Sequence, residues 1–514
     1  MNPHRIRLTL AAFGLVALWA CNDRKIQTPI PAPTGTSHNF FEQNLNNNID
    51  ILFMVDDSSS MTTVQQNVAM NFPVFINILT SLPVRPNMHI AITTSDMGAG
   101  SFTASVPGCM APDLGNFVNT TRAATDPACT TNRLNANEHF FIDQDNGATK
   151  NYSGDLATAF GCVAQVGASG CGFESQLESV RAALGDSFSD SAHHIPARTP
   201  PANNANFLRD DAYLAVILIT NEDDNSTPPD SQLDDPNQNA VTDPLGPLAS
   251  FRNTEFCVTC DGLMANSGRI PRQAGGPYAN CRSNDPLFYS DPLHACLPMQ
   301  LYIDYFKRVK KTPNHVILAA ISAPTDPFAV IVDQQTGFPA LQHSCSSSNG
   351  TFGDPAVRIK QVTDSVGALG SFTSICQNSY ADAFGVIANL IGRQLGRQCV
   401  DGVLAKAPDF TAAIPTPTNG MVVDPTTVSC TVDDVQYIGT PMQKDLRTLP
   451  PCATGGQATG ACWALIGDDK CMPSGAKVTV CRNGFDPTNA AMPCPMGGTV
   501  EDGVTAVINC ATLP

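Results

Sequence analysis

Three oxygen-bearing side chains at alternate positions follow the first strongly apolar segment after the N-terminal region. Asp56, Ser58 and Ser60 come directly after the apolar run at residues 51–55. A strand over that run would deliver all three onto one tight turn. A carboxylate and two hydroxyls are hard oxygen ligands, which suit a small divalent cation such as Mg²⁺. Because ligands of open α/β sheets bind at the carboxyl ends of the strands, we expect a cation site at this turn.

Segments with strand and helix patterns alternate from residue 49 to residue 398. The apolar runs are continuous, as expected for strands covered on both faces. Such alternation predicts an α/β fold with a doubly wound, mostly parallel sheet. The predicted strands are residues 51–55, 88–94, 212–220 and 315–321. The predicted helices are residues 64–79, 173–184, 299–309, 359–366 and 384–395.

The Asp56-x-Ser58-x-Ser60 turn, placed between a buried strand and a helix, resembles the metal-ion-dependent adhesion site of von Willebrand factor A (VWA) domains. The order of strands and helices from residue 47 to residue 398 is similar to that Rossmann-like family. The resemblance implies that Ser58 and Ser60 ligate the cation directly and that Asp56 holds it through water. It also implies Mg²⁺, or alternatively Ca²⁺ or Mn²⁺, as the bound ion.

Two positions depart from the family's pattern. The family's later loop supplies a threonine before a helix, and this chain has Glu174 and Ser175 there instead. Either the Ser175 hydroxyl or the Glu174 carboxylate would take its place. The strand ending at residue 220 is followed by Asn221 where the family has an aspartate, and Asp223 or Asp224 in the same loop is a further candidate ligand. A neutral amide binds a cation more weakly than a carboxylate does.

The N-terminal region has the pattern of an export signal. A basic start and the apolar stretch of residues 8–20 predict a signal peptide over residues 1–20, too short to be a permanent membrane span. The segment ending in Cys21 resembles a bacterial lipobox, which implies acylation of Cys21. A plain secretory signal with an incidental cysteine is the alternative. Residues 21–46 contain several prolines and are predicted to be a lipidated, unstructured tether.

Nineteen cysteines support an exported, oxidising location. Without Cys21 an even number remains, and they fall into even local groups, so we expect each group to form disulfides within its own segment. The candidates before the last group of eight are Cys109 and Cys129, Cys162 and Cys171, Cys257, Cys260, Cys281 and Cys296, and Cys345 and Cys376. A redox pair at Cys257 and Cys260 is the alternative for that spacing.

Two stretches rich in Asn, Asp, Pro and Gly interrupt the alternating pattern. We predict disulfide-rich insertions in the core at about residues 97–160 and 225–297. After residue 398 helical periodicity is lost, and short Thr- and Val-containing runs separated by Gly and Pro follow. Residues 399–514 are therefore predicted to be a small, β-rich, cysteine-rich domain.

The formal net charge is −17, and lysine and arginine form no basic stripe, so nucleic acid is not an expected partner. The chain also lacks a zinc-hydrolase helix motif, a nucleophile elbow and a phosphate-binding Gly-rich loop. The sequence therefore predicts a non-enzymatic lipoprotein of the cell envelope. A metal-bridged acidic group would join it to a protein or cell-surface ligand, with the lipid anchor in the membrane. The alternative is a structural envelope protein with a degenerate, metal-free site.

Overall fold

We describe the fold from a computed structural model of the whole chain. It describes residues 35–42, 48–82, 85–106, 108–210, 212–231, 258–259, 280, 282–283, 296–311, 315–332, 339–395, 400, 403–414, 416–436, 443–452, 460–468, 471, 474–486, 494 and 504–513. The predicted signal peptide and Cys21 lie outside these residues, as do Cys257, Cys260 and Cys281 and most of the second predicted insertion.

A seven-stranded sheet forms the centre of the protein, in the order β16-β11-β8-β2-β3-β5-β6. The first five strands in this order are mutually parallel, and β5 and β6 continue the sheet as an antiparallel pair. The bounds are β2 Asn48–Val55, β3 Asn87–Thr93, β5 Phe141–Gln144, β6 Thr149–Lys150, β8 Tyr213–Ile219, β11 Val316–Ser322 and β16 Gly370–Ser374. The prediction of a mostly parallel α/β sheet is confirmed.

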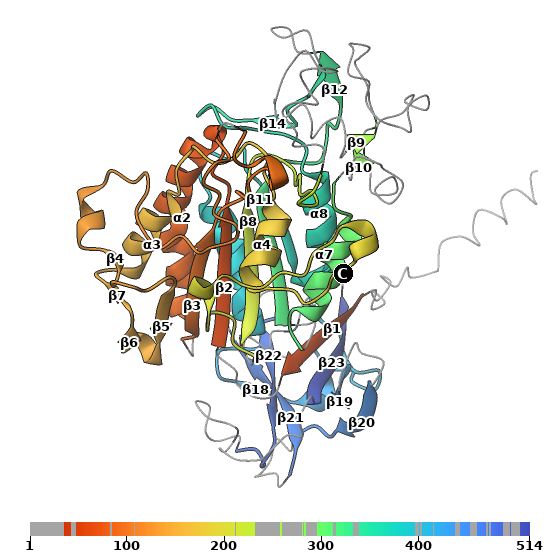
Figure 1. The fold of residues 1–514 in the computed structure, drawn as a ribbon. Coiled ribbons are helices and arrows are strands. Elements are labelled where there is room, and N and C mark those ends of the chain that lie inside the picture. The colour runs from red at the N-terminus through yellow and green to blue at the C-terminus, as the bar shows by residue number, and fades with distance from the viewer. Residues whose placement is uncertain are drawn as a thin grey trace, which may run out of the picture.

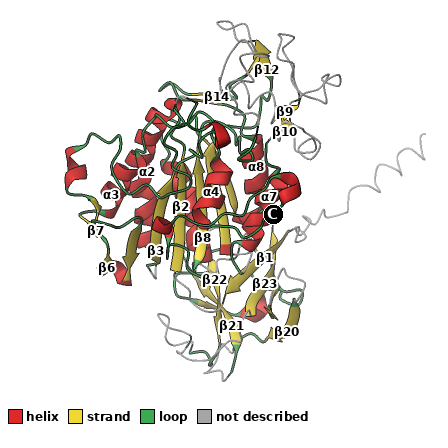
Figure 2. Ribbon diagram, viewed as in Figure 1, coloured by secondary structure: helices red, strands yellow, loops and turns green. Residues whose placement is uncertain are grey.

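Helices cover both faces of this sheet, as Figure 2 shows. On one face, α2, α3 and α9 pack on the side chains that the central strands direct to that face. Phe53 of the sheet and Phe72 of α2 lie in contact within this core. On the other face, α4, α7 and α8 pack around Leu52 and Leu214. Burial on both faces explains why the central strands are continuous apolar runs in the sequence. The bounds are α2 Thr62–Thr80, α3 Leu156–Ala164, α4 Gln176–Leu184, α7 Met299–Arg308, α8 Val357–Asp364 and α9 Ala381–Gln394.

The first predicted insertion is more closely integrated than we expected. Strands β5 and β6 lie within residues 97–160 and extend the central sheet, and α3 begins inside the same range. Strands β4 (Arg133–Leu134) and β7 (Tyr152–Ser153) form a separate antiparallel pair. Because these strands are very short and lie among polar residues, their alternation is too brief to distinguish them from a loop.

The described strands after residue 402 form small antiparallel sheets, as predicted for a β-rich segment. One sheet contains β17 (Val403–Leu404), β19 (Cys430–Gln436), β20 (Lys444–Leu449) and β23 (Val504–Leu513). The other contains β18 (Val422–Val423), β21 (Cys462–Gly467) and β22 (Ala476–Cys481). These sheets lie at the end of the central sheet opposite the hairpin of β14 (Cys345–Ser346) and β15 (Phe352–Gly353) (Figure 1).

Strand β1 (Gly35–Glu42) corrects the predicted tether. It pairs antiparallel with β23 along eight residues, within the range 21–46 that we expected to be unstructured. A strand in this position is stabilised by main-chain hydrogen bonds to β23, which do not depend on a distinctive side-chain pattern. Short paired segments remain as β9 Val258–Thr259 with β10 Arg282–Ser283, and β12 Val330–Val332 with β13 Pro339–Leu341.

Six disulfides join cysteines that are both within the described residues, and two of them correct our predicted grouping. Cys109 bonds to Cys171, and Cys129 bonds to Cys162, so the two pairs cross between the groups we expected to close separately. The crossing arises because α3 carries Cys162 beside the turn at residues 127–130. The predicted pair Cys345–Cys376 is confirmed, and three bonds join cysteines of the last group, Cys430–Cys510, Cys452–Cys462 and Cys481–Cys494.

Cys296 is also disulfide-bonded. Disulfides persist in oxidising compartments, so this content supports an extracellular type of environment. Within the described part of the chain, no helix has the length and apolar character needed to cross a membrane.

Candidate metal site

Asp56 lies at the carboxyl end of β2 and is completely buried. Its Oδ2 accepts a hydrogen bond of 2.6 Å from the Thr220 hydroxyl, which follows the neighbouring strand β8. Its Oδ1 accepts from the backbone N–H of Ser58 at 2.8 Å and from the Ser95 hydroxyl, after β3, at 3.1 Å. Groups from three adjacent parallel strands therefore fix this carboxylate at one edge of the sheet.

The two predicted hydroxyl ligands stand beside each other above Asp56. Ser58 Oγ and Ser60 Oγ are 3.2 Å apart, and the Ser60 hydroxyl donates to Asn221 Oδ1 at 3.0 Å. The Asn221 amide in turn donates to the carbonyl oxygen of Phe352 in β15. The structure thus brings together Asp56, Ser58, Ser60 and Asn221, as the motif predicts.

Glu174 and Glu222 supply two further carboxyl groups at this edge. Glu174 is buried, and no amide N–H or alcohol O–H among the described residues donates to its Oε2. The carboxyl group of Glu222 lies close to that of Glu174, and the charge of Asp56 acts on both groups. Two carboxylates would repel each other here, so a proton or a cation shared by the two groups would stabilise the pair.

Burial is the main cause of the unusual electrostatics of the site. It raises the pKa of Glu174 well above its ordinary value, with the neighbouring Glu222 as the next cause. Burial and the charge of Asp56 raise the pKa of Glu222 to about 8. Burial also raises the pKa of Asp57 to about 8, with added repulsion from Asp56 and Asp96. These carboxyl groups are poorly solvated as anions, so burial favours their protonated forms, and a bound cation would replace those protons.

His343 lies beside the carboxyl cluster, close enough to Glu222 for their charges to interact. His343 Nδ1 is 2.6 Å from Asp354 Oδ1, and its ring stacks on Phe352. The hydrogen bond to Asp354 raises the pKa of His343, and the charge of Glu222 adds to the effect. The hairpin that carries Phe352 is anchored by the Cys345–Cys376 disulfide, so this side of the cluster has a covalent support.

Ser175 does not join the cluster in this structure. Its hydroxyl donates to the backbone carbonyl of Phe173 at 3.4 Å. The residue lines a separate cavity of about 260 Å³ together with Met97 and Glu178. Of the two alternatives for the missing threonine, the carboxylate of Glu174 therefore fits better than the hydroxyl of Ser175.

Asp223 has a different role from the one predicted. Its carboxylate accepts from the backbone N–H groups of Arg358 and Ile359, in the first turn of α8. The next residue, Asp224, accepts from the backbone N–H of Leu177 in the first turn of α4. Consecutive carboxylates thus cap two helices on the same face of the sheet, since each satisfies helix N–H groups that have no partner inside their helix. We therefore remove Asp223 from the candidate ligands.

Three residues of the cluster were not predicted as site residues. Thr220 and Ser95 each follow a central strand and donate to Asp56, and Glu222 pairs with Glu174. Thr220 and Ser95 could have been predicted from the sequence, because hydroxyl residues that closely follow parallel strands lie at the ligand-binding edge of the sheet. Glu222 could not be distinguished from Asp223 and Asp224, since its direction depends on the course of the loop.

The oxygen donors fit a hard divalent cation. Ser58, Ser60 and Glu174 could ligate it directly, with Asp56 and Asn221 acting through water or an amide oxygen. No group of three or more His, Cys, Asp or Glu side chains poised to hold a metal occurs among the described residues.

Comparison with profiles of known protein families gives no match for this chain, and comparison with curated protein sequences gives none either.

Proposed function

We propose that this protein is an exported, lipid-anchored binding protein of the VWA type, without enzymatic activity. Its cation site at the carboxyl edge of the central sheet would hold Mg²⁺, or Ca²⁺ or Mn²⁺ in its place. An acidic group of a protein or cell-surface ligand would complete the coordination of the ion.

The close pair of Glu174 and Glu222 beside Asp56 is the observation that carries this proposal. Both acids are held in a poorly solvated position, and Glu174 Oε2 receives no hydrogen bond from an amide or alcohol of the described chain. If both acids were ionised, they would need a compensating positive charge at this position. A divalent cation between Glu174 and the two serine hydroxyls would supply it.

The residues of the proposed site would have different roles in binding the cation. Asp56 is held by three donors and would orient water around the ion, while Ser58 and Ser60 present neutral oxygens. Asn221 is neutral too, so part of the ion's charge would remain available to a ligand. When bound, the cation supplies a positive centre that a carboxylate of the partner can share. Ser60 is only half-buried, which leaves this side open to a partner.

The position of β1 gives the proposed orientation. The chain enters the fold through β1, which pairs with β23 at the end of the molecule opposite the β14–β15 hairpin (Figure 1). An acyl group on Cys21 would therefore hold that end toward the membrane. The candidate cation site would face outward, where a surface ligand can reach it.

One observation favours the alternative of a metal-free structural protein. Ser58, Ser60 and Asn221 form a chain of mutual hydrogen bonds, so these groups have partners without an ion. In that case the Glu174–Glu222 pair would keep its shared proton. A chelator would then change neither the thermal stability of the protein nor its binding to a partner.

Isothermal titration calorimetry with Mg²⁺ and Mn²⁺ tests the proposal. We expect saturable binding to the native protein and at least a roughly tenfold loss of affinity in the Ser58→Ala/Ser60→Ala variant, equivalent to about 1.4 kcal/mol. Affinity equal in the two proteins would refute the metal site. Affinity capture from envelope extracts, with and without EDTA, then tests whether the ion mediates partner binding.

A further inference from the structure

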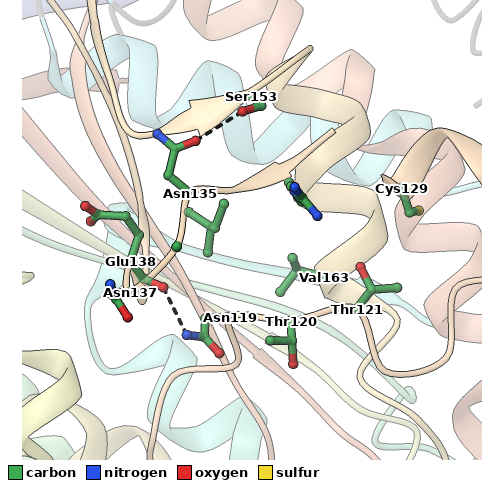
Figure 3. A pocket seen from close by; sticks show the side chains of 12 residues that line it. Asn119, Thr120, Thr121, Cys129, Asn135, Asn137, Glu138, Ser153 and Val163 are labelled. Atoms are coloured by element: carbon green, nitrogen blue, oxygen red, sulfur yellow. Dashed lines mark hydrogen bonds between the residues drawn. The ribbon is translucent and has the colours of Figure 1, made fainter. Parts of the chain in front are cut away.

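A second cavity lies within the first insertion, away from the candidate cation site. It has a volume of about 570 Å³ and lies between the loop at residues 119–121, the β4–β7 pair and helix α3 (Figure 3). Pockets for small ligands have volumes of roughly 300–1,000 Å³. The cavity is therefore large enough to hold a small molecule or one end of a polymer.

Covalent and hydrogen-bonded supports fix the walls of this cavity. The Cys129–Cys162 disulfide ties one wall to α3. The Ser153 hydroxyl donates to Asn135 Oδ1, and the Asn119 amide donates to the backbone carbonyl of Glu138, as the dashed lines in Figure 3 show. A cavity with supported walls loses little entropy when a ligand binds.

The walls carry hydrogen-bonding groups that the protein does not use. Thr120, Thr121 and Arg133 are exposed, and within the described residues their side chains make no ion pair or hydrogen bond. Glu138 uses only Oε2, which accepts from the Asn151 amide. Donors and acceptors are therefore interspersed, which suits ligand hydroxyl groups because each of them both donates and accepts.

The charge of the cavity is balanced, and part of its lining is apolar. Arg133 and Glu138 are the charged residues among those that line it, so the formal charges cancel. The apolar part of the lining comes from the exposed Ala136, the edges of the buried Leu134 and Val163, and Cys129. An ion would gain little here, whereas a neutral molecule with hydroxyls on its rim and C–H groups on one face would match both surfaces.

We propose that this cavity binds a neutral pyranose unit of a saccharide. The C–H face of the ring would pack on Ala136 and the edges of Leu134 and Val163. Its hydroxyls would bond to Arg133, Glu138 and the threonine hydroxyls. This proposal does not depend on the cation site. For an exported protein, it adds a second route to a cell-surface ligand.

Saturation-transfer NMR with the full chain in EDTA tests the proposal. The probes are glucose, galactose, mannose and N-acetylglucosamine, with glucuronate and glucosamine as charged comparisons. We expect transfer to at least one neutral sugar and a loss of affinity of roughly tenfold in Arg133→Met. The exposed control Lys311→Met should bind as the native protein does, since Lys311 pairs with Asp210 outside the cavity.

A second variant guards against a folding artefact. Thr121→Trp places a bulky ring at an exposed position of the wall and should abolish binding while leaving the melting temperature within a few degrees of the native value. The proposal is overturned if no neutral sugar binds, if only the charged sugars bind, or if both cavity variants bind as well as Lys311→Met.

Discussion

The Thr220 hydroxyl donates a 2.6 Å hydrogen bond to Asp56 Oδ2 and so joins the ends of two adjacent parallel strands. The two residues are 164 positions apart in the sequence. This bond, with those from Ser95 and the Ser58 backbone, holds the Asp56 carboxylate in place before any ligand arrives. Because this side chain is already fixed, ordering it would cost little free energy when the proposed ion binds.

Separate substitutions of Glu174 and Ser175 should show which of the two ligates the proposed ion at the position where the VWA pattern has a threonine. Glu174→Gln removes the carboxyl group that would ligate the ion in the proposed site and should weaken Mg²⁺ binding by at least about tenfold, as measured by calorimetry. Ser175→Ala is the matched control, because its hydroxyl contacts only the Phe173 carbonyl, and its affinity should equal that of the native protein. The reverse order of affinities would show that Ser175, and not Glu174, is the ligand.

The role assigned to Asp223 predicts a change in stability without a change in metal binding. Asp223→Ala leaves the N–H groups of Arg358 and Ile359 without their carboxylate acceptor. Loss of a helix cap typically costs about 0.5–2 kcal/mol, so chemical denaturation should give a lower free energy of unfolding for this variant. Asp223→Asn should recover part of that loss. A drop in Mg²⁺ affinity in either folded variant would return Asp223 to the ligand set.

The disulfide connectivity predicts a specific peptide map. Digestion without reduction should give the linked pairs Cys109–Cys171 and Cys129–Cys162. Removing one such bond typically costs about 2–5 kcal/mol in a small exported domain. Peptides linking Cys109 to Cys129 would contradict the arrangement, and so would abundant alkylation of these cysteines in the native protein.

His89 predicts an acid-sensitive contribution to stability. Burial, and then the charge of Arg209, lower its pKa to about 4, and its Nδ1 lies 2.9 Å from the Phe207 carbonyl. The unfolded chain therefore binds a proton more readily than the folded chain between about pH 6.5 and pH 4. Over that window the folded state loses stability as the pH falls, by up to about 3 kcal/mol from this group.

The matched measurement for His89 is denaturant unfolding of the native protein and His89→Gln at pH 7 and at pH 4.5. The loss of stability on acidification should be smaller in the variant, since glutamine does not titrate. Equal losses in the two proteins would show that His89 does not contribute to the acid sensitivity.

The central sheet could be predicted from the sequence because its middle strands are buried on both faces. The sequence segments that form β2, β8 and β11 contain continuous apolar runs. Such runs are typical of parallel strands that are covered by helices on both faces of the sheet. The hairpin β5–β6 was missed because two to four residues carry too little pattern. Strand β1 was missed since its pairing partner, β23, lies at the other end of the chain.

The candidate site was predictable in part for a similar reason. Asp56, Ser58 and Ser60 lie in one turn, and their spacing alone places them together. Contacts between distant segments were not predictable, such as the approach of Glu222 to Glu174 and the crossing of the disulfides. These contacts depend on the conformations of loops, which a resemblance to a family does not predict.

The most direct test of the central claim is an anomalous difference map from crystals soaked in MnCl₂. We predict a strong peak at about 2.1 Å from Ser58 Oγ, Ser60 Oγ and a Glu174 carboxylate oxygen, close to the distances usual for small divalent cations. A map with no peak among these three side chains, and with the Glu174–Glu222 contact unchanged, would contradict the account.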